Sequence, residues 1–418
     1  MGRDQAADPS GVETVTLDDA RARDAADPLR GFRDRFALPD GVIYLDGNSL
    51  GPLPRSTAPA LTDMIERQWG ERLIRSWNEG WIEAPQRIGG KIAPLIGADA
   101  DEVIVADSTS SNLFRLIVAA LRLDPARTVV VSELGNFPTD LHIAEGAVAC
   151  VPGATLKAVP REAIGAALGD DTALLLLTHV HYKTAERFDM AAWTARAHAA
   201  GALMLWDLSH SAGAVPVDLN GSKADLAVGC GYKYLNGGPG APAFLHVNRK
   251  WQDRLTNALS GWMGHAAPFA FEDGYSPAPG MTRWLTGTPP ILGLAALEAG
   301  VDLWSEVAPE TVWAKSAALF DTFAAIGDSL GLECVSPRDA ALRGSHISFR
   351  HAHAYPLCQA LIARGVIGDF RAPDILRFGL TPLYLGFEDI VCAGDVLRDL
   401  LITGTYRNPV FSNRNAVT

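Results

Sequence analysis

Two residues that directly follow apolar, strand-like segments could together hold an aldehyde cofactor. Asp207 ends the segment ALMLWD (202–207), and Lys233 follows DLAVGC (225–230) in the glycine-rich stretch GYKYLNGGPG. A buried carboxylate can balance a protonated ring nitrogen, and a lysine amine can form an imine with an aldehyde. Alone, Asp207 could merely cap a turn and Lys233 could be a solvated turn residue. Of the seven lysines in the chain, however, this is the one between an apolar segment and a glycine-rich turn, so the pair favours a cofactor site.

If the aldehyde is pyridoxal 5'-phosphate, a phosphate-binding segment should also be present. The stretch DSTSSNLFRL offers one, because the hydroxyl residues Ser108 to Ser111 lead directly into an apolar helical segment. The N–H groups at a helix start carry the positive end of the helix dipole and bind phosphate well. Ordinary capping of that helix by a hydroxyl side chain is the competing interpretation.

A third candidate stretch, ELGNFPTDLHIAEG, follows the apolar segment TVVVS at 128–132. Phe137 in this stretch could lie flat on an aromatic cofactor, and Asp140 could contact the substituents of its ring. A Phe-Pro turn that simply fills a gap in the core is the alternative.

The composition is that of an acidic globular enzyme. The 418 residues are 48% hydrophobic and 20% charged, enough for a large and a small domain. The formal net charge of −12 argues against nucleic acid or an anionic membrane as partner, since either would favour a Lys/Arg-rich face. No segment reaches the roughly 20 apolar residues of a membrane span, and the first residues lack the order of a secretory signal. We therefore expect a cytoplasmic protein.

Neither a disulfide framework nor a metal site is favoured. The five cysteines are widely spaced and include no C-x-x-C pair, which is typical of buried thiols. The pairs His179/His181 and His351/His353 have the spacing that places two imidazoles on one face of a strand. No cluster of carboxylates or cysteines accompanies them, so we expect no metal.

Alternating strand-like and helical segments predict the scaffold of the site. The strand-like segments are continuously apolar, which is typical of an α/β fold with a mainly parallel sheet covered by helices on both faces. Ligands of such open sheets bind at the carboxyl ends of the strands, where Asp207 and Lys233 are expected. The predicted strands are 42–46, 128–132, 173–178, 202–207, 225–230 and 241–247, and the predicted helices include 112–123 and 190–201.

We expect an N-terminal arm and two domains. Residues 1–28 are rich in Ala, Asp and Arg without an apolar period, which predicts a loose arm or a short helix without chemistry. Residues 29–300 would form mainly the large cofactor-binding domain, of which about 29–60 could pack with the small one. In residues 301–418, two helical segments around short strands such as HISFR predict a smaller α+β domain.

Seven segments, spread from about residue 30 to about residue 400, together resemble the kynureninase family of fold-type I pyridoxal-phosphate enzymes. GYKYLN combined with SGWMGH is specific to this family within its superfamily of class V aminotransferase-like enzymes. The segments are YLDGNSLGPLP, STSSNLF, NFPTD, WDLSHSAG, GCGYKYLNGGPG, SGWMGH and RFGLTPLYLGFEDI.

The resemblance implies a homodimeric hydrolase of tryptophan catabolism and NAD biosynthesis. Its members use water to cleave the Cβ–Cγ bond of L-kynurenine, giving anthranilate and L-alanine, and 3-hydroxykynurenine is a second candidate substrate. The resemblance makes Lys233 the Schiff-base lysine, Asp207 the partner of the pyridinium nitrogen and Tyr232 a candidate acid-base group. The further cofactor residues that it implies are Thr109, Ser110, Phe137, Asp140, Thr178, His210, Trp262 and Thr288.

The same resemblance implies how the substrate and a second subunit complete the site. Trp262 and Thr288 would come from the neighbouring subunit, so the active site would be shared within the homodimer. Arg377 would bind the substrate α-carboxylate through a bidentate pair, and Trp77 would contact its aromatic ring.

Two other kinds of function remain open at this point. A cysteine desulfurase or a class V aminotransferase would share Lys233 and Asp207, but a desulfurase needs a reactive cysteine on a mobile loop. Cys334, Cys358 and Cys392 lie instead in apolar, element-like surroundings. A non-catalytic protein that binds pyridoxal phosphate or kynurenine would be expected to lack Lys233 or Asp207, and both are present.

Overall fold

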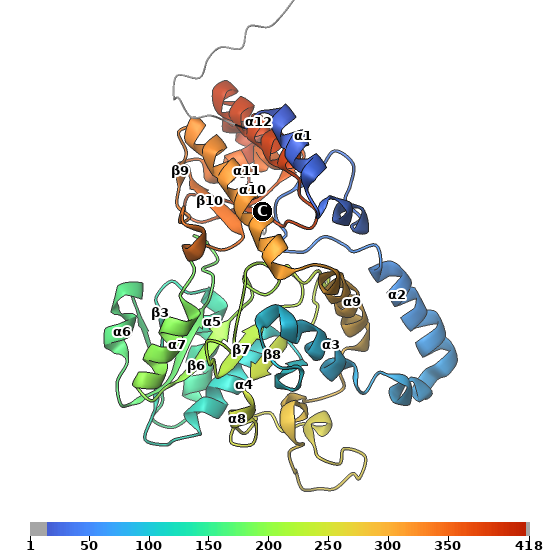
Figure 1. Cartoon of the computed structure of the whole chain (residues 1–418). Coiled ribbons are helices and arrows are strands. Elements are labelled where there is room, and N and C mark those ends of the chain that lie inside the picture. The colour runs from blue at the N-terminus through green and yellow to red at the C-terminus, as the bar shows by residue number, and fades with distance from the viewer. Residues whose placement is uncertain (1–14, 415–418) are drawn as a thin grey trace, which may run out of the picture. The chain divides into compact units, whose positions relative to one another are not determined.

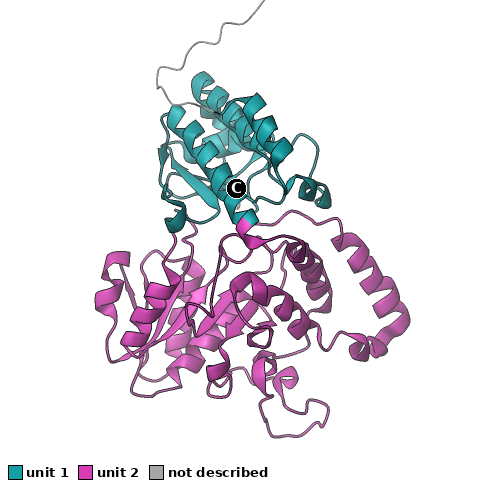
Figure 2. Cartoon of the chain, in the orientation of Figure 1, with its two compact units in different colours: residues 1–48, 183–186, 311–418 teal, residues 49–182, 187–310 magenta. Residues whose placement is uncertain are grey.

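The computed structural model describes residues 15–414 and divides the chain into two compact units (Figure 2). Among the described residues, unit 1 comprises residues 15–48, 183–186 and 311–414, and unit 2 comprises residues 49–182 and 187–310. Residues 1–14 of the predicted N-terminal arm lie outside the described residues.

A seven-stranded sheet forms the centre of unit 2, with the strand order β2-β8-β7-β6-β5-β3-β4. Neighbouring strands from β7 to β4 run parallel, whereas β8 is antiparallel to both β7 and β2. The sheet is therefore mainly parallel, as the sequence predicts. The strands are β2 (Val103–Val105), β3 (Val129–Glu133), β4 (Thr155–Val159), β5 (Thr172–Thr178), β6 (Leu203–Asp207), β7 (Leu226–Gly229) and β8 (Phe244–Val247).

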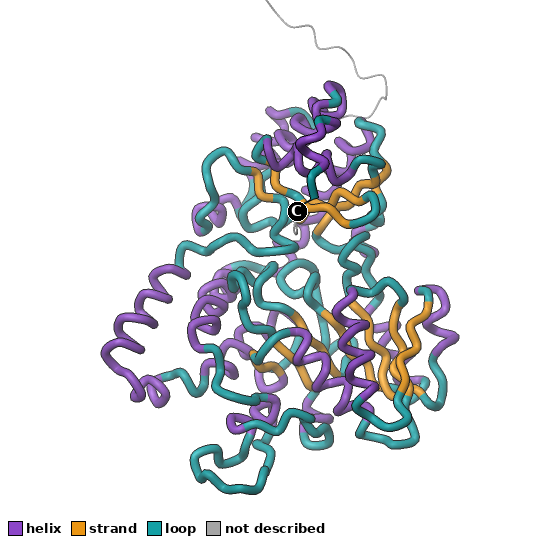
Figure 3. The backbone as a smooth tube through the Cα atoms, turned by 180° about the vertical axis from the view of Figure 1, so that it is seen from behind, coloured by secondary structure: helices purple, strands orange, loops and turns teal. Residues whose placement is uncertain are grey.

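Helices flank this sheet, as Figures 1 and 3 show from opposite sides. Every residue of β5 and β6 is buried, because a parallel sheet covered on both faces has no solvent side. Helix α4 packs on β5, β7 and β8, and α7 packs on β6. The helices that follow the strands are α4 (Thr109–Leu121), α5 (Pro138–Ala149), α6 (Ile164–Ala167), α7 (Met190–Ala199) and α8 (Arg249–Gln252).

Three more helices complete unit 2. They are α2 (Thr57–Asp63), which continues as a π-helix over Met64–Arg72, α3 (Ala84–Ile92) and α9 (Ile291–Val301). Helix α2 contacts α9, and α3 contacts both α9 and β2.

Unit 1 contains a four-stranded antiparallel sheet with the order β12-β13-β10-β9 and a separate parallel pair, β1 with β11. The rings of Phe323, Phe349 and Phe378 pack together in its core, with centroids 5.0–6.3 Å apart. Its strands are β1 (Ile43–Tyr44), β9 (Glu333–Cys334), β10 (His346–Arg350), β11 (Val366–Ile367), β12 (Asp369–Arg371) and β13 (Ile375–Gly379). Its helices are α1 (Leu17–Ala26), α10 (Pro309–Ser329), α11 (Ala354–Ala363) and α12 (Phe387–Thr403). Within residues 15–414, no helix has the length and apolar character needed to span a membrane.

The structure departs from the predicted strands in two respects. The segment 42–46 does not join the large sheet, because β1 pairs with β11 of unit 1. The edge strands β2 and β4 are absent from the prediction: β2 has only three residues, and β4 mixes polar with apolar side chains. Neither strand gives the long apolar pattern that marks the buried strands.

Candidate functional site

Asp207 occupies the carboxyl end of β6 in the middle of the sheet. It is opposite Thr178 of β5 and Val228 of β7 in the strand register, and its side chain is buried. Its Oδ1 accepts hydrogen bonds from the backbone N–H (2.8 Å) and the hydroxyl (2.6 Å) of Ser209. Burial raises the pKa of Asp207, whereas these two donors act against that rise by favouring the ionised carboxylate. Asp207 is thus a buried hydrogen-bond acceptor at the carboxyl end of a central strand.

A second carboxyl group, Asp140 of α5, lies next to Asp207. The two side chains share a hydrogen bond, and the hydroxyl of Thr178 lies 3.0 Å from Asp140 Oδ2. Complete burial and the neighbouring charge of Asp207 raise the pKa of Asp140 well above its usual value. The structure therefore brings three predicted residues, Asp140, Thr178 and Asp207, into one network.

Lys233 reaches the site from the loop after β7. Its Nζ lies 3.0 Å from Nε2 of His210, and 5.8 and 5.7 Å from the ring centroids of Phe137 and Tyr232. The loop is tightly enclosed: a Cβ added to Gly51 would lie 2.2 Å from the carbonyl oxygen of Lys233. These contacts bring three more predicted residues, His210, Phe137 and Tyr232, together around the amine of Lys233.

The predicted phosphate-binding segment is the start of α4. Ser108 caps this helix by accepting the N–H of Ser111 at 3.3 Å, so that Thr109 and Ser110 are its first two residues. In the preceding turn, Asp107 has a left-handed backbone (φ 44°) and forms an ion pair of 2.9 Å with the buried Arg115. The two interpretations coincide here, because the same residues cap the helix and form an anion-binding helix start.

Three predicted residues lie in other parts of unit 2. The Trp262 indole donates a hydrogen bond to the Pro268 carbonyl, and its ring contacts Phe269 at 5.6 Å. Thr288 is exposed, and in the described part of the chain neither it nor Trp262 forms a hydrogen bond or ring contact with Lys233. Trp77 packs edge-to-face on Trp81 and lines a separate cavity of about 200 Å³.

Arg377 belongs to β13 of unit 1, where it is fully buried. Its guanidinium forms a two-point ion pair with Asp369, in which Nε donates to Oδ1 at 2.8 Å and Nη2 donates to Oδ2. The same carboxylate accepts a hydrogen bond from Arg371 at 2.8 Å. Such a pair fixes the plane of the guanidinium fork.

The histidine pairs are engaged in other contacts. His179 is buried beside the hydroxyl of Ser211 at 2.9 Å, and burial lowers its pKa to about 3. His181 Nε2 lies 3.1 Å from the Gly135 carbonyl. Residues 15–414 include no cluster of three or more His, Cys, Asp or Glu side chains suited to a metal ion.

Two residues of the site were absent from the prediction. Ser209 supplies both donors to Asp207, and Asn136 contacts Thr178 with its Oδ1 2.5 Å from the threonine hydroxyl. Each lies within a segment that the sequence singled out, WDLSHSAG or NFPTD. The position of a serine two residues after a strand-end Asp is itself a signal, because Ser and Asp in this spacing often form a side-chain to backbone turn.

Known proteins resemble this chain over almost its whole length. Residues 312–397 match the family described as the kynureninase C-terminal domain. A kynureninase of Burkholderia mallei is 51% identical over 414 residues, covering 96% of this chain and 100% of the relative. A kynureninase of Pseudomonas fluorescens is 48% identical over 415 residues, covering 97% of this chain and 100% of the relative.

Solved structures share the fold at much lower identity. A cysteine desulfurase from Thermococcus onnurineus gives a TM-score of 0.76 at 18% identity and covers 89% of this chain and 98% of its own. A mutant of the cystine C-S lyase C-DES, with glycine covalently linked to its PLP cofactor, gives 0.77 at 17% identity, covering 87% and 98%. Likeness at this identity shows the fold alone, and it confirms the predicted fold-type I class.

Proposed function

This chain belongs to the kynureninase family, as relatives about half identical over nearly its whole length show, and we propose how its site performs the reaction of that family. The reaction is the pyridoxal-phosphate-dependent hydrolysis of L-kynurenine to anthranilate and L-alanine. The enzyme is thus a hydrolase of a carbon–carbon bond in a ketonic substrate.

The buried carboxylate of Asp207 near Lys233 is the observation that carries the proposal. Within residues 15–414, no Lys, Arg or His side chain forms an ion pair with Asp207, although the residue is buried. A buried carboxylate is costly unless a cation pairs with it directly, and a protonated pyridine nitrogen would form such a pair. When bound, pyridoxal phosphate supplies an aldehyde that captures the substrate amine and a ring that stabilises negative charge at the adjacent carbon. The residues present fit this cofactor.

Each of the other central residues has a defined task in this proposal. Lys233 would hold the aldehyde and, once displaced by the substrate amine, would remove the proton from the substrate Cα. His210 would position the Lys233 amine, since its Nε2 lies 3.0 Å from the lysine Nζ. Phe137 would stack on the cofactor ring, and the first N–H groups of α4, at Thr109 and Ser110, would bind the phosphate. Tyr232 is the nearest candidate for acid-base help when water adds to the γ-carbonyl.

Substrate recognition would use residues outside this centre. Arg377, whose guanidinium plane is fixed by Asp369, would bind the α-carboxylate of L-kynurenine through a second bidentate pair. Trp77 would contact its aromatic ring. We also propose that the reaction belongs to cytoplasmic tryptophan catabolism and NAD biosynthesis.

We also propose that two copies of the chain complete each site. Trp262 is 44% exposed and Phe271 beside it is 77% exposed, an arrangement of aromatic rings that favours burial against another surface. A second group of exposed apolar side chains consists of Ile65 and Trp69 in the π-helix after α2 and Ile74 just beyond it. These surfaces support a homodimer in which Trp262 and Thr288 reach the cofactor phosphate of the partner.

A desulfurase function finds no support in four of the five cysteines. Burial raises the pKa of Cys230, Cys334 and Cys392, and raises that of Cys358 to about 12. A thiol in such surroundings stays protonated at neutral pH and is a poor nucleophile. The desulfurase neighbours therefore contribute the fold and no activity.

The test is an absorbance spectrum of the purified protein with pyridoxal phosphate, followed by addition of L-kynurenine while anthranilate fluorescence is recorded. A cofactor band and anthranilate release that both vanish in Lys233→Ala, but persist in Lys157→Ala, are expected. A band without anthranilate would contradict the kynureninase reaction. No lysine-dependent band would contradict the site itself.

A further inference from the structure

The side-chain amide of Asn136 is held in one orientation by its neighbours. Its Oδ1 accepts the backbone N–H of Phe137 at 2.7 Å. Its Nδ2 donates to the hydroxyl of Ser132 at 3.4 Å, and that hydroxyl donates its own proton to the Leu176 carbonyl at 2.8 Å. If the amide were flipped, its NH₂ group would face the N–H of Phe137, and its oxygen would face the Ser132 oxygen, whose proton is already donated to Leu176. Both contacts therefore select the same orientation of the amide.

This orientation decides how Thr178 uses its single hydroxyl proton. The threonine Oγ1 lies 2.5 Å from Asn136 Oδ1, which is an acceptor and cannot donate. Thr178 therefore donates to Asn136. The same oxygen lies 3.0 Å from Asp140 Oδ2, so Thr178 can accept a proton from a neutral Asp140 but has none left to donate to an ionised one.

Asp207 has the opposite surroundings. Its Oδ1 accepts two hydrogen bonds from Ser209, at 2.8 and 2.6 Å, and both favour the ionised form. Two buried carboxyl groups that share a hydrogen bond cannot both be ionised without strong repulsion. The charge of Lys233 lowers the pKa of both carboxyl groups and so does not choose between them. The two donors to Asp207 and the use of the Thr178 proton by Asn136 place the shared proton on Asp140, and burial raises the pKa of Asp140 in the same direction.

We propose that Asn136 is a positioning residue which, acting through the hydroxyl of Thr178, keeps Asp140 protonated so that the pair carries one negative charge, located on Asp207. This inference rests on the proposed function, since the charge on Asp207 is the one that would face the protonated ring nitrogen. When Asp140 is neutral, the ring nitrogen would face a negative charge located on Asp207 alone, and not one shared between the two carboxyl groups.

The test measures protonation of Asp140 directly in the holoenzyme by infrared spectroscopy. The wild-type protein should show the carbonyl-stretch band of a buried carboxylic acid at neutral pH, and Asp140→Asn should remove it. In Asn136→Ala, the freed hydroxyl of Thr178 can donate to an ionised Asp140, which lowers its pKa. We expect the band to be lost at a pH about one unit lower than in the wild type, because a pKa shift of about one unit corresponds to the free energy of one hydrogen bond.

Two comparisons make the test specific. Asn257→Ala removes another buried amide, one that donates to the Arg283 carbonyl and accepts the Leu259 N–H, and should leave the band unchanged. In a Thr178→Val background, Asn136→Ala should cause no further shift, because its effect passes through that hydroxyl. Absence of an Asp140-dependent band, or a shift that persists with Thr178→Val, would overturn the proposal. Anthranilate release from the same samples reports separately on the proposed function.

Discussion

At the scale of single residues, the charge of Asp207 is the property on which the proposed chemistry depends most. Asp207→Asn keeps the volume of the side chain and its position at the end of β6, but replaces the carboxylate with a neutral amide. We expect anthranilate release to fall roughly 10²–10⁴-fold, because a protonated ring nitrogen then loses its counter-charge in a dry site.

The matched variant for that experiment is Ser209→Ala, which removes one donor to Asp207 and keeps the carboxylate. It should lower the rate much less than Asp207→Asn. Circular dichroism of both variants checks that the fold is intact. Near-native activity in a folded Asp207→Asn enzyme would rule out the counter-charge role.

His179 gives a prediction for stability against pH. Burial lowers its pKa in the folded protein to about 3, whereas the unfolded chain takes up a proton near pH 6.5. Unfolding therefore binds a proton between these values, and stability should decline as the pH falls below about 6.5, by up to ~1.4 kcal/mol for each pH unit. Urea unfolding between about pH 5 and about pH 7 measures this slope.

The contribution of His179 is isolated by comparison with His179→Gln. That variant should lose about one proton from the pH dependence of the free energy of unfolding. Equal slopes in wild type and His179→Gln would show that His179 titrates alike in the folded and unfolded chain.

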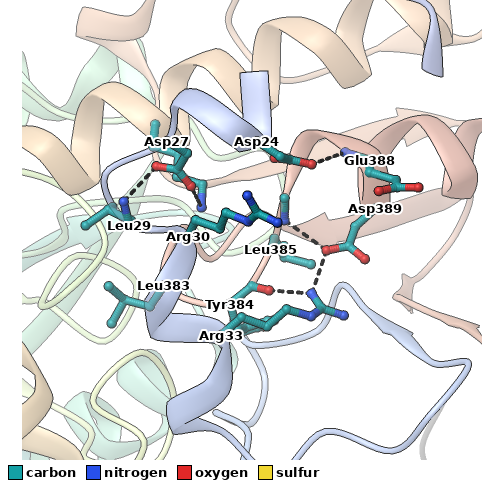
Figure 4. A pocket seen from close by; sticks show the side chains of 12 residues that line it. Asp24, Asp27, Leu29, Arg30, Arg33, Leu383, Tyr384, Leu385, Glu388 and Asp389 are labelled. Atoms are coloured by element: carbon teal, nitrogen blue, oxygen red, sulfur yellow. Dashed lines mark hydrogen bonds and ion pairs between the residues drawn. The ribbon is translucent and has the colours of Figure 1, made fainter. Parts of the chain in front are cut away.

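At the scale of elements, α12 receives its N-terminal cap from a distant part of the chain. Asp24 of α1 accepts the N–H groups of Phe387 (2.7 Å) and Glu388 (2.9 Å), as Figure 4 shows for Glu388. The position before them is Gly386, where an added Cβ would lie 2.8 Å from the Asp24 carboxylate. A carboxylate here satisfies two free donors and lies at the positive end of the helix dipole.

Asp24→Ala should therefore lower the free energy of unfolding by about 1–3 kcal/mol, measured by urea titration. Asp18→Ala, a change on the same helix at a side chain that is 97% exposed, should have little effect. If both variants unfolded like the wild type, the cap would contribute nothing to stability.

The sequence predicts such elements unevenly, for a physical reason. Continuous apolar segments located β5, β6 and β7 because burial of a parallel strand on both faces leaves a local pattern. The Asp24 cap joins residues 363 positions apart, so no local pattern contains it, and the N-terminal arm was assigned no chemistry. Likewise Asn136 acts through contacts with Thr178, which comes from another strand.

At the scale of the whole molecule, the residues of the proposed site come from segments that lie far apart in the sequence. The central group of Lys233, His210 and Phe137 comes from three separate loops of unit 2. Trp262 and Thr288 make no contact with that group within residues 15–414, and Arg377 belongs to unit 1. Family motifs in the sequence predict roles for these residues, but the contacts of each side chain depend on tertiary structure, which no local pattern contains.

The proposed sharing of the active site between two copies predicts complementation of inactive variants. Lys233→Ala lacks the cofactor lysine, and Trp262→Ala lacks the group proposed to reach the partner's phosphate. When the two chains are co-expressed with different tags and the mixed dimer is purified, one of its sites combines an intact Lys233 with an intact Trp262. Anthranilate release should therefore reappear in the mixed dimer although each variant alone is inactive or strongly impaired. Pairing Lys233→Ala with the double variant Lys233→Ala/Trp262→Ala restores no complete site and should stay inactive. If Trp262 served its own chain instead, the first mixture would gain nothing over the Trp262→Ala enzyme, because no subunit would then contain both residues.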